Sequence, residues 1–495
     1  MVTRNDAGRT PVLVGVGQSI ERNASVTVLD LNERATCAAF EDAPGLSDQI
    51  ERLTTICAVF SPSGKAPSSE LASRLGMSGV HCETTTAGGN TPQWAVTRAA
   101  ADIAAGELKA TLIVGAEATR SMRAADPGAD FMGASRASRG EEENPEPVVG
   151  PSMSGVLTSA EVDAGFVRPA EVYPVFESAL AASESRSPLE QREYIGQIQA
   201  SFSRVAAGNP FAWFREELTA SEISQPSALN RLTAEPYTKR MNAFPNVDQG
   251  SALLLTSLEI AREAGLGDQC VFPWGGATNT DLAPAARRDL GDSPAIGAAA
   301  GALFAALGIG IDDIDWIDLY SCFPSAFQVG AKAIGLANDD ARGLTVTGGM
   351  PFFGGPGNNY SSHAIASVAL RLRDSGRLAY VAANGGFLSK HSLGVYGSEP
   401  PVGGFKSLDT SNEQAKIEAS AIPVASEASG QATVAGGTVV YARDGSVEKA
   451  PVIAILDDGR RIVANAEPGV LSGLAGRSLV GSRISVIGSP PVYKL

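Results

Sequence analysis

Short hydrophobic runs recur along the chain, separated by longer segments in which apolar positions have helical spacing. Buried strands that alternate with helices are typical of an α/β protein whose sheets are covered by helices. The pattern therefore predicts an α/β fold. The runs expected to form strands are Val12–Val16, Thr55–Phe60, Thr111–Val114, Ala252–Leu255, Ile314–Leu319, Leu344–Thr347 and Leu378–Ala383.

The pattern contains an internal repeat. Residues 78–118 and 342–386 each predict a strand, a loop with threonine and paired glycines, an alanine-rich helix and a second strand. Gly106 and Gly376 stand where a glycine commonly ends a helix. Two interpretations are open: a duplicated architecture whose two glycine loops face one site, or two βαβ units that look alike without being related.

The second glycine loop lies in Gly343–His363, which reads GLTVTGGMPFFGGPGNNYSSH. A strand at Leu344–Thr347 is expected to enter the loop, and a helix from about Ser361 to Arg373 is expected to follow. Backbone N–H groups at the start of such a helix suit a phosphate, a carboxylate or a developing oxyanion. The alternative is a tight turn that carries no chemistry.

Residues 119–245 do not keep the strand–helix rhythm, which predicts an inserted loop domain over the site. The insertion contains an acidic segment, Gly140–Pro151, and an amphipathic helix, Pro188–Ala206. Its last part is rich in cations, which could bind the phosphates of a ligand or be ordinary surface charges. These cations are Arg231, Lys239 and Arg240.

The two halves of the body are expected at residues 1–118 with 246–270, and at residues 271–406. Residues 407–430 are polar and small, which indicates a helix followed by a linker. Residues 431–495 alternate between β-rich runs and hairpin signals such as Asp444-Gly445 and Asp458-Gly459. They predict a small C-terminal β-barrel of the OB type.

Composition narrows the partners and the compartment. The chain has 495 residues and a net charge of −15, which argues against nucleic acid or an anionic membrane as the main partner. No apolar run approaches the ~18 residues of a membrane-spanning helix. The N-terminus lacks the apolar segment of a secretory signal, and five scattered cysteines fit reduced thiols, so we expect a cytoplasmic protein. With three histidines, a metal site is not expected.

Five segments resemble the thiolase superfamily, in particular its sterol-carrier-protein thiolase branch: AAADIAAGELKATLIVGAEA, NVDQGSALLLTS, DWIDLYSCFPSAF, TGGMPFFGGPGNN and NGGFLSKHSLGVY. The resemblance covers roughly residues 10–405. The appended β domain makes the chain similar to monomer-forming thiolase-like proteins of actinobacteria that carry an extra C-terminal domain. The resemblance implies a five-layered α/β/α/β/α body with duplicated halves, a monomer, and a coenzyme A (CoA) thioester as ligand without a covalently bound cofactor.

The resemblance also shows which catalytic groups of a thiolase are missing. The nucleophilic cysteine, which a thiolase carries at the start of the first repeat's helix, falls on Gly89. The histidine of the Gly-His-Pro triplet, which polarises the thioester, falls on Gly355, between Gly354 and Pro356. The acid/base cysteine falls on Ala383. A thiolase reaction through an acyl-cysteine is therefore not expected.

Other polar residues remain at matching positions. Tyr320 takes the place of the histidine in the branch's His-Asp-Cys-Phe motif, and His391 follows the last glycine pair as a histidine does in several relatives. With Asn358 of the second glycine loop, they are the expected catalytic residues, Tyr320 as donor and His391 as base. Each could instead be a structural side chain. The residues expected to bind the thioester or CoA are Gly89, Asn90, Arg231, Tyr237, Lys239, Arg240, Ser321, Gly354, Gly355 and Gly385.

Three functions are compatible with this resemblance. The first is an acyl-CoA-binding protein of lipid metabolism in the acetyl-CoA acetyltransferase family, with altered or weak catalysis. The second is a retro-aldol carbon–carbon lyase acting on a β-hydroxyacyl-CoA. The superfamily includes such lyases, which lack the thiolase cysteine, rely on tyrosine at the position of Tyr320 and require a separate β-barrel partner. The third is a non-catalytic sensor or scaffold that binds CoA esters.

Overall fold

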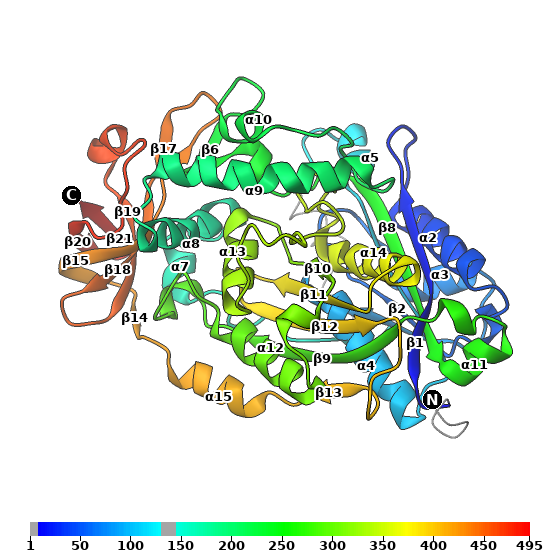
Figure 1. Ribbon diagram of the computed structural model, residues 1–495. Helices are drawn as coiled ribbons and strands as arrows, with labels where there is room; N and C mark the ends of the chain where they lie inside the picture. Colours follow the sequence, from blue (N-terminus) through cyan, green and yellow to red (C-terminus); the bar gives the residue numbers. More distant parts are fainter. Residues whose placement is uncertain (1–7, 130–144) are drawn as a thin grey trace.

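The computed structural model describes residues 8–129 and 145–495 (Figure 1). The N-terminal half forms a six-stranded sheet in the order β1-β8-β4-β2-β3-β5, in which β8 runs antiparallel to both β1 and β4. The outer face of this sheet is covered by α2 (Val28–Asp42) and α3 (Pro67–Arg74). The strands are β1 (Pro11–Ile20), β2 (Arg52–Thr55), β3 (His81–Thr85), β4 (Ala110–Ala118), β5 (Val148–Val149) and β8 (Asp248–Ser257).

The C-terminal half forms a five-stranded sheet in the order β10-β11-β12-β9-β13. Helix α12 (Pro294–Leu307) packs against β9 and β12, and it also contacts α13 (Pro324–Ala333). The strands are β9 (Phe272–Thr280), β10 (Trp316–Asp318), β11 (Leu378–Gly385), β12 (Lys390–Gly397) and β13 (Lys406–Leu408).

Two helices fill the space between the sheets, α4 (Thr91–Ala105) and α14 (Tyr360–Asp374). Their apolar side chains join both sheets in one hydrophobic core, as Val96 and Ile365 do with Ile113 of β4 and Val381 of β11. The order of layers is thus helices, sheet, helices, sheet, helices (Figure 1). The predicted five-layered α/β body with a C-terminal barrel is confirmed.

The two glycine loops each precede one of the central helices, but one predicted strand is wrong. Leu344–Thr347 does not pair in a sheet. Its backbone instead wraps around Asp318, whose Oδ2 accepts hydrogen bonds from the N–H groups of Val346 (3.0 Å) and Thr347 (3.1 Å). A β-branched run forms a strand only where its N–H groups are free for a ladder, and here a buried carboxylate takes them.

The inserted segment lies over the C-terminal half and is mainly helical. The first part of the acidic segment that begins at Gly140 lies, up to residue 144, outside the described residues. Helix α9 crosses the upper part of the view in Figure 1, below α10. The elements are α5 (Thr119–Ala125), α7 (Ser159–Asp163), α8 (Pro169–Ser183), α9 (Pro188–Gly208), α10 (Ala220–Ser224), β6 (Leu232–Ala234) and β7 (Tyr237–Thr238).

The C-terminal strands close into a small barrel, because β19 pairs both with β18 and with β21. The pairing order β15-β18-β19-β21-β20 returns to β15. Helix α15 (Ser411–Ala419) precedes the barrel, and α11 (Leu258–Glu263) follows β8. The strands are β14 (Val424–Ala425), β15 (Ala428–Gly437), β16 (Val440–Tyr441), β17 (Val447–Lys449), β18 (Pro451–Leu456), β19 (Arg461–Ala466), β20 (Arg483–Gly488) and β21 (Pro491–Lys494).

The barrel packs against the insertion. Strand β16 pairs with β6, so that the insertion and the barrel share a four-stranded sheet. Lys449 forms a 2.6 Å ion pair with the buried Glu171 of α8. Two barrel residues, Ile453 and Val463, belong to the same hydrophobic core as the insertion and the C-terminal half. The barrel therefore braces the insertion against the body.

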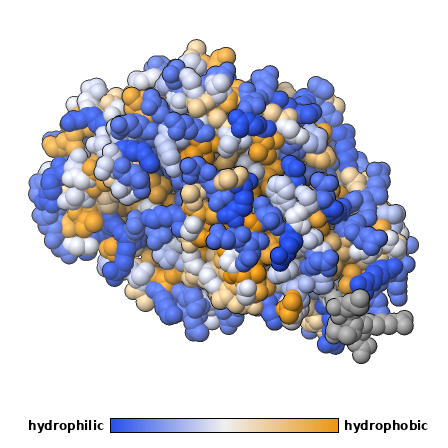
Figure 2. Space-filling view, viewed as in Figure 1, coloured by the Kyte–Doolittle hydropathy of each residue, from blue (hydrophilic) through white to orange (hydrophobic). Residues whose placement is uncertain are grey.

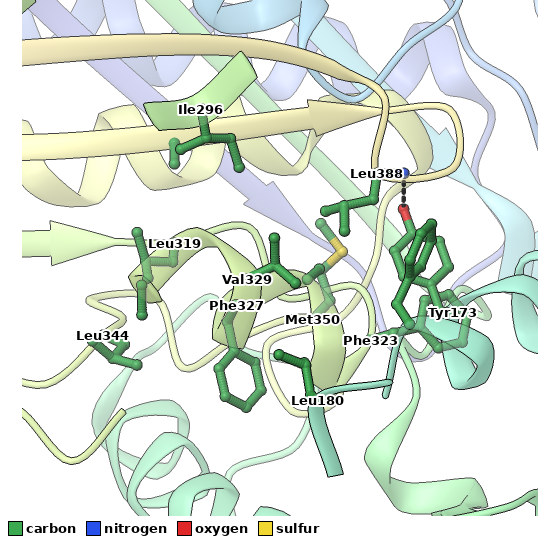
Figure 3. Packing of buried hydrophobic residues seen from close by; sticks show 14 of the residues in the cluster. Tyr173, Leu180, Ile296, Leu319, Phe323, Phe327, Val329, Leu344, Met350 and Leu388 are labelled. Atoms are coloured by element: carbon green, nitrogen blue, oxygen red, sulfur yellow. Dashed lines mark hydrogen bonds between the residues drawn. The ribbon is translucent and has the colours of Figure 1, made fainter. Parts of the chain in front are cut away.

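The core beneath the insertion surrounds Tyr173 of α8 (Figure 3). Its ring stacks on Phe323 with centroids 4.5 Å apart, and its hydroxyl accepts a 3.0 Å hydrogen bond from the Leu388 N–H. On the face shown in Figure 2, apolar residues form small groups separated by polar ones. Among the described residues, no helix is both long and apolar enough to cross a membrane.

Candidate functional site

The turn between β3 and α4 meets the C-terminal end of β11 at backbone level. Gly88–Asn90 lies before α4, and Gly385 ends β11. A Cβ on Gly385 would lie 2.5 Å from Asn90 Oδ1, which is closer than side-chain carbons approach other atoms. Asn90 is in turn held by β12, because its Nδ2 donates to Ser392 Oγ at 3.3 Å. The structure therefore brings together Gly89, Asn90 and Gly385.

Tyr320 reaches into this junction from the loop after β10. A Cβ on Gly89 would overlap the Tyr320 hydroxyl and would lie 2.7 Å from its Cζ. The carbonyl oxygen of Asn384 also lies too close to leave room for that Cβ. The place where a side chain on Gly89 would begin is thus filled by a phenol. The two residues are brought together from opposite halves, 231 positions apart in the chain.

The phenol is a hydrogen-bond donor rather than a base. Burial raises the pKa of Tyr320 well above its usual range, and the neighbouring Cys322 adds to the shift. Its ring meets that of Tyr360 edge to face, at 5.6 Å between centroids and 86° between planes. Near neutral pH the Tyr320 hydroxyl therefore keeps its proton and can donate it to a carbonyl or enolate oxygen.

A buried carboxylate holds the second glycine loop in place. Asp318 Oδ2 accepts from the hydroxyls of Thr345 (2.9 Å) and Thr347 (3.0 Å), in addition to the two backbone bonds described above. Tyr360 donates to Asp318 Oδ1 at 3.2 Å. Burial raises the pKa of Asp318 even though these bonds oppose the shift. The network fixes the entrance to the loop without contributing a side chain to its open face.

Two neighbouring glycines of the second glycine loop differ in the space that is available for a side chain. Gly354 has a φ of +108°, and a Cβ there would lie 2.5 Å from Gln249 Oε1. At Gly355 the nearest atom to a Cβ would be the Ala243 Cβ, at 3.5 Å, an ordinary contact distance. The Gly355 N–H donates to Phe244 O at 2.9 Å. Gly355 therefore has room for a side chain.

The asparagines after the loop bridge the two halves. Asn358 Nδ2 donates to Cys57 O at 2.8 Å, and Asn359 Nδ2 donates to Gly115 O at 2.6 Å. Asn359 Oδ1 is buried and has no hydrogen-bond partner within the described part of the chain. The Ser361 hydroxyl, in the first turn of α14, donates to Gly89 O at 2.9 Å. The side-chain amide of Asn358 thus forms a structural hydrogen bond. Ser361 is a residue of the site that sequence analysis did not identify.

Tyr173 and Asn384 are two further residues that sequence analysis missed. Asn384 Nδ2 donates to the Tyr173 hydroxyl at 2.9 Å, and that hydroxyl donates to Gly386 O at 3.2 Å (Figure 3 shows its bond to Leu388). These hydrogen bonds of Tyr173 in α8 hold the turn after β11 in place. Burial raises the pKa of the nearby Cys322 thiol to about 12, so that it does not replace the missing nucleophile.

His391 belongs to a different cluster. Its Nε2 is 3.1 Å from Asp281 Oδ2. Burial acts to raise the pKa of Asp281, but the His391 contact and a nearby buried arginine outweigh it and leave that pKa below its usual value. Ser392, the next residue, faces Asn90, so the alternation of a strand directs His391 to the opposite face of β12. The expectation that His391 acts as a base at Tyr320 is therefore not supported by this geometry.

The remaining predicted residues divide into structural and exposed groups. The Tyr237 hydroxyl donates to Glu177 at 2.6 Å, and Ser321 Oγ accepts from the Met350 N–H at 3.1 Å. Both side chains are fully buried. By contrast, Lys239 is exposed, and the half-buried Arg231 and Arg240 each donate to a backbone carbonyl. These three cations surround the β6–β7 hairpin.

Solved structures of other proteins share this fold. A monomeric SCP2-thiolase-like protein, type 1, from Mycobacterium smegmatis is 31% identical, with 100% of both chains covered and a TM-score of 0.83. The Ltp2–ChsH2(DUF35) aldolase is 18% identical over 79% of this chain and 98% of its own, with a TM-score of 0.60. Human mitochondrial 3-ketoacyl-CoA thiolase, solved in complex with CoA, is 16% identical over 79% of this chain and 98% of its own, with a TM-score of 0.58.

The body of the chain thus has the fold of a thiolase, and the first of these proteins matches it over its whole length. No protein-family model matches the chain, and no curated protein sequence does either.

Proposed function

Because the chain belongs to the SCP2-thiolase-like branch of the thiolase superfamily, we propose that it binds a CoA thioester at the junction of its two glycine loops without forming an acyl-cysteine. The thioester lies between the turn Gly88–Asn90 and the loop residues 348–357. The family and the CoA bound to the human mitochondrial thiolase support the ligand class, and the junction described above supports the place.

One observation carries the proposal: the Tyr320 hydroxyl stands where a side chain on Gly89 would begin. A thiolase uses that space for the sulfur that receives the acyl group. Here a phenol that stays protonated near neutral pH points into it. A thioester whose carbonyl oxygen lies in this space receives a hydrogen bond from Tyr320, which stabilises negative charge on that oxygen.

The cations around the β6–β7 hairpin are suited to the phosphates of CoA. Arg240 is three residues before Ala243, whose Cβ would lie 3.5 Å from a Cβ on Gly355. Three residues of chain span at most about 11 Å, so Arg240 starts close to the glycine loop. Lys239 and Arg231 are adjacent, since the Lys239 N–H donates to Arg231 O at 2.9 Å. Phosphates bound here leave the pantetheine arm free to reach the junction.

We also propose that the chain acts as a monomer. Strand β5 covers the edge of the N-terminal sheet, where the Thr84 N–H donates to Pro147 O at 2.9 Å and the Thr86 N–H to Val149 O at 2.7 Å. A free sheet edge is a common place for two chains to pair. Here the chain's own strand occupies that edge, and the related M. smegmatis protein is monomeric.

A second function is favoured by the protonated tyrosine: retro-aldol cleavage of a β-hydroxyacyl-CoA. In that reaction the Cα–Cβ bond breaks, the β-hydroxyl loses its proton and Cβ leaves as an aldehyde or ketone. The electron pair stays on the thioester as an enolate until Cα is protonated. Tyr320 is suited to stabilise the enolate oxygen as a donor. The shared fold with an aldolase is compatible with this reaction.

The test combines binding and turnover in the full chain. Calorimetric titration with an acyl-CoA measures binding, and incubation with β-hydroxyacyl-CoA esters followed by trapping of the carbonyl product measures cleavage. Tyr320→Phe removes the donor while keeping the ring. Tyr380→Phe is the matched control, because Tyr380 is another buried tyrosine and its hydroxyl has no hydrogen-bond partner among the residues that the structure describes.

Binding of the ester by the wild type, with at least about 100-fold slower carbonyl release in Tyr320→Phe than in Tyr380→Phe, supports a lyase. Binding that is retained without turnover of any ester supports the sensor or scaffold. Failure to bind any CoA ester contradicts the proposal as a whole.

A further inference from the structure

A cavity of about 490 Å³ lies between the last turn of α9, the second half of α14 and the end of β1. In Figure 1, α9 lies above α14. The volume of the cavity is in the range of pockets that hold small molecules, roughly 300–1,000 Å³. Apolar walls of this kind favour a ligand whose surface is mostly hydrocarbon. The residues that form these walls are Val205, Pro210, Phe211, Val346 and Leu370.

Gln18 of β1 is one of the two most buried polar residues in the lining of this cavity, with 9% exposed. Its side chain lies on the face of β1 that is directed towards α14, as that of Val16 does two residues earlier. Gln18 Oε1 is 2.7 Å from His363 Nδ1. Within the described residues this is the only hydrogen bond of the Gln18 side chain, so its Nε2 remains an unpaired donor. Buried amide N–H groups are rarely left unpaired, which points to a ligand.

Ser367 of α14 provides a second donor beside the first. It comes one helical turn after His363 and therefore lies on the same face of α14 as the ring that contacts Gln18. Only 9% of Ser367 is exposed, and it lines the cavity. Its hydroxyl has no hydrogen-bond partner in the part of the chain that the structure describes. Two buried donors without partners thus lie at neighbouring places in one cavity.

The exposed charges at the mouth of the cavity balance one another. Arg204 Nε is 2.7 Å from Glu217 Oε1. Arg371 and Asp374 are three residues apart on α14, where side chains are neighbours on the helix surface. Burial lowers the pKa of His363 to about 3, so the ring behind Gln18 is uncharged near neutral pH. The cavity therefore has no net charge that would select an ion, and it favours a neutral ligand.

We propose that this cavity binds a neutral, largely apolar ketone, with its carbonyl oxygen between Gln18 Nε2 and the Ser367 hydroxyl. A carbonyl oxygen has two lone pairs, so it can accept from both donors at once. The hydrocarbon part of the ligand then lies against the apolar walls, towards Phe211 and the partly exposed Leu370. A hydrocarbon without the carbonyl would leave both donors unpaired, and a carboxylate would lose its hydration without gaining a cation.

The ketone site is separate from the junction of the two glycine loops, although it lies behind the second loop. The His363 ring, which contacts Gln18, also contacts Phe353, with 5.1 Å between ring centroids. Gln249 Nε2 donates to Phe211 O of the cavity wall and to Phe353 O, at 2.9 Å each. These residues separate the cavity from Gly354. The ketone site does not depend on CoA binding, and it can be tested without any CoA ester.

The experiment is a fluorescence titration of prodan, a neutral aminonaphthalene ketone whose emission shifts to shorter wavelength in apolar surroundings, with the full chain. Two competitors have the same ring system: one lacks the ketone, and the other carries a carboxylate in its place. Gly208→Phe fills part of the cavity, because Gly208 lines it and a Cβ there would meet nothing within 4 Å. Gly301→Phe is the matched control, because Gly301 of α12 has the same open space outside the cavity. Ser367→Ala removes one donor and keeps a residue that suits a helix.

We expect the wild type and Gly301→Phe to bind prodan equally, with a Kd below about 100 μM. Gly208→Phe, checked for folding by circular dichroism, should bind at least about tenfold more weakly, and Ser367→Ala about two- to tenfold more weakly. The proposal is overturned if about 100 μM protein does not shift the emission of about 1 μM prodan, or if either competitor binds as tightly as the ketone. It is also overturned if folded Gly208→Phe binds like Gly301→Phe, or if Ser367→Ala binds like the wild type.

Discussion

The contact between Gly89 and Tyr320 makes a strong prediction about adding a single carbon. In Gly89→Ala the new Cβ would lie 2.7 Å from Tyr320 Cζ, and closer still to the hydroxyl and to the Asn384 carbonyl oxygen. Carbon atoms in contact are about 3.5–4.0 Å apart, so the tyrosine must shift by about 1 Å. Overpacking of this kind costs roughly 1–3 kcal/mol.

Gly355→Ala is the matched comparison, because the same carbon is added to a glycine of the second glycine loop. There the nearest atom would be at 3.5 Å. Both glycines have backbone angles that other residues adopt. A glycine replaced by alanine without strain stabilises a protein by about 0.4–1 kcal/mol. The two variants should therefore differ in unfolding free energy by roughly 1.5–4 kcal/mol, with Gly355→Ala the more stable.

Differential scanning calorimetry measures this difference. For 495 residues the unfolding entropy is about 1 kcal/mol/K, so the midpoints of unfolding should differ by roughly 2–4 °C. In a Tyr320→Leu background, which empties part of the space, Gly89→Ala should cost at least about 1 kcal/mol less. Equal midpoints for the two alanine variants, or an unchanged cost in the Tyr320→Leu background, would show that the phenol does not fill the place where a side chain on Gly89 would begin.

Three further predictions concern the surroundings of the site. Glu117 lies beside the glycine loop, and burial raises its pKa from 4.5 to about 7. The folded state therefore holds the proton more tightly than the unfolded state, and the free energy of unfolding falls as the pH rises through this range. Urea unfolding should show a decrease of about 3 kcal/mol between pH 4.5 and 7 that is absent in Glu117→Gln; equal pH profiles would contradict it. Asp318→Ala leaves the loop's N–H groups unpaired and should lower the free energy of unfolding by at least about 2 kcal/mol. Hydrogen exchange at residues 345–349 should become faster, and unchanged exchange would refute the anchoring role. Light scattering of the purified chain should give the mass of one chain, and a stable dimer would refute the role of β5 in covering the sheet edge.

The sequence predicted the features that depend on local pattern. The repeat, the helix at about Ser361–Arg373 and the hairpins of the barrel all follow from periodicity and turn residues, and each has a counterpart in the structure. Leu344–Thr347 was predicted wrongly, because Asp318 lies outside the run and takes its N–H groups.

The arrangement of the site depends on contacts that no local pattern contains. Tyr173 comes from the insertion and has no motif around it, yet its hydroxyl fixes the turn after β11. The face of β12 on which His391 lies depends on strand register, and a shift by one residue would reverse it. The meeting of Gly89 with Tyr320 depends on how the two halves pack. Resemblance to a family identified both residues, but only the structure shows that one occupies the place of the other's missing side chain.

The most direct test of the account is a crystal structure of the chain with a CoA thioester analogue in which a CH2 group replaces the sulfur, so that the acyl oxygen is kept and the thioester bond cannot be cleaved. The account predicts the phosphates at the β6–β7 hairpin and the acyl oxygen within about 3 Å of the Tyr320 hydroxyl. A CoA moiety bound elsewhere, or an acyl oxygen held away from Tyr320, would contradict it.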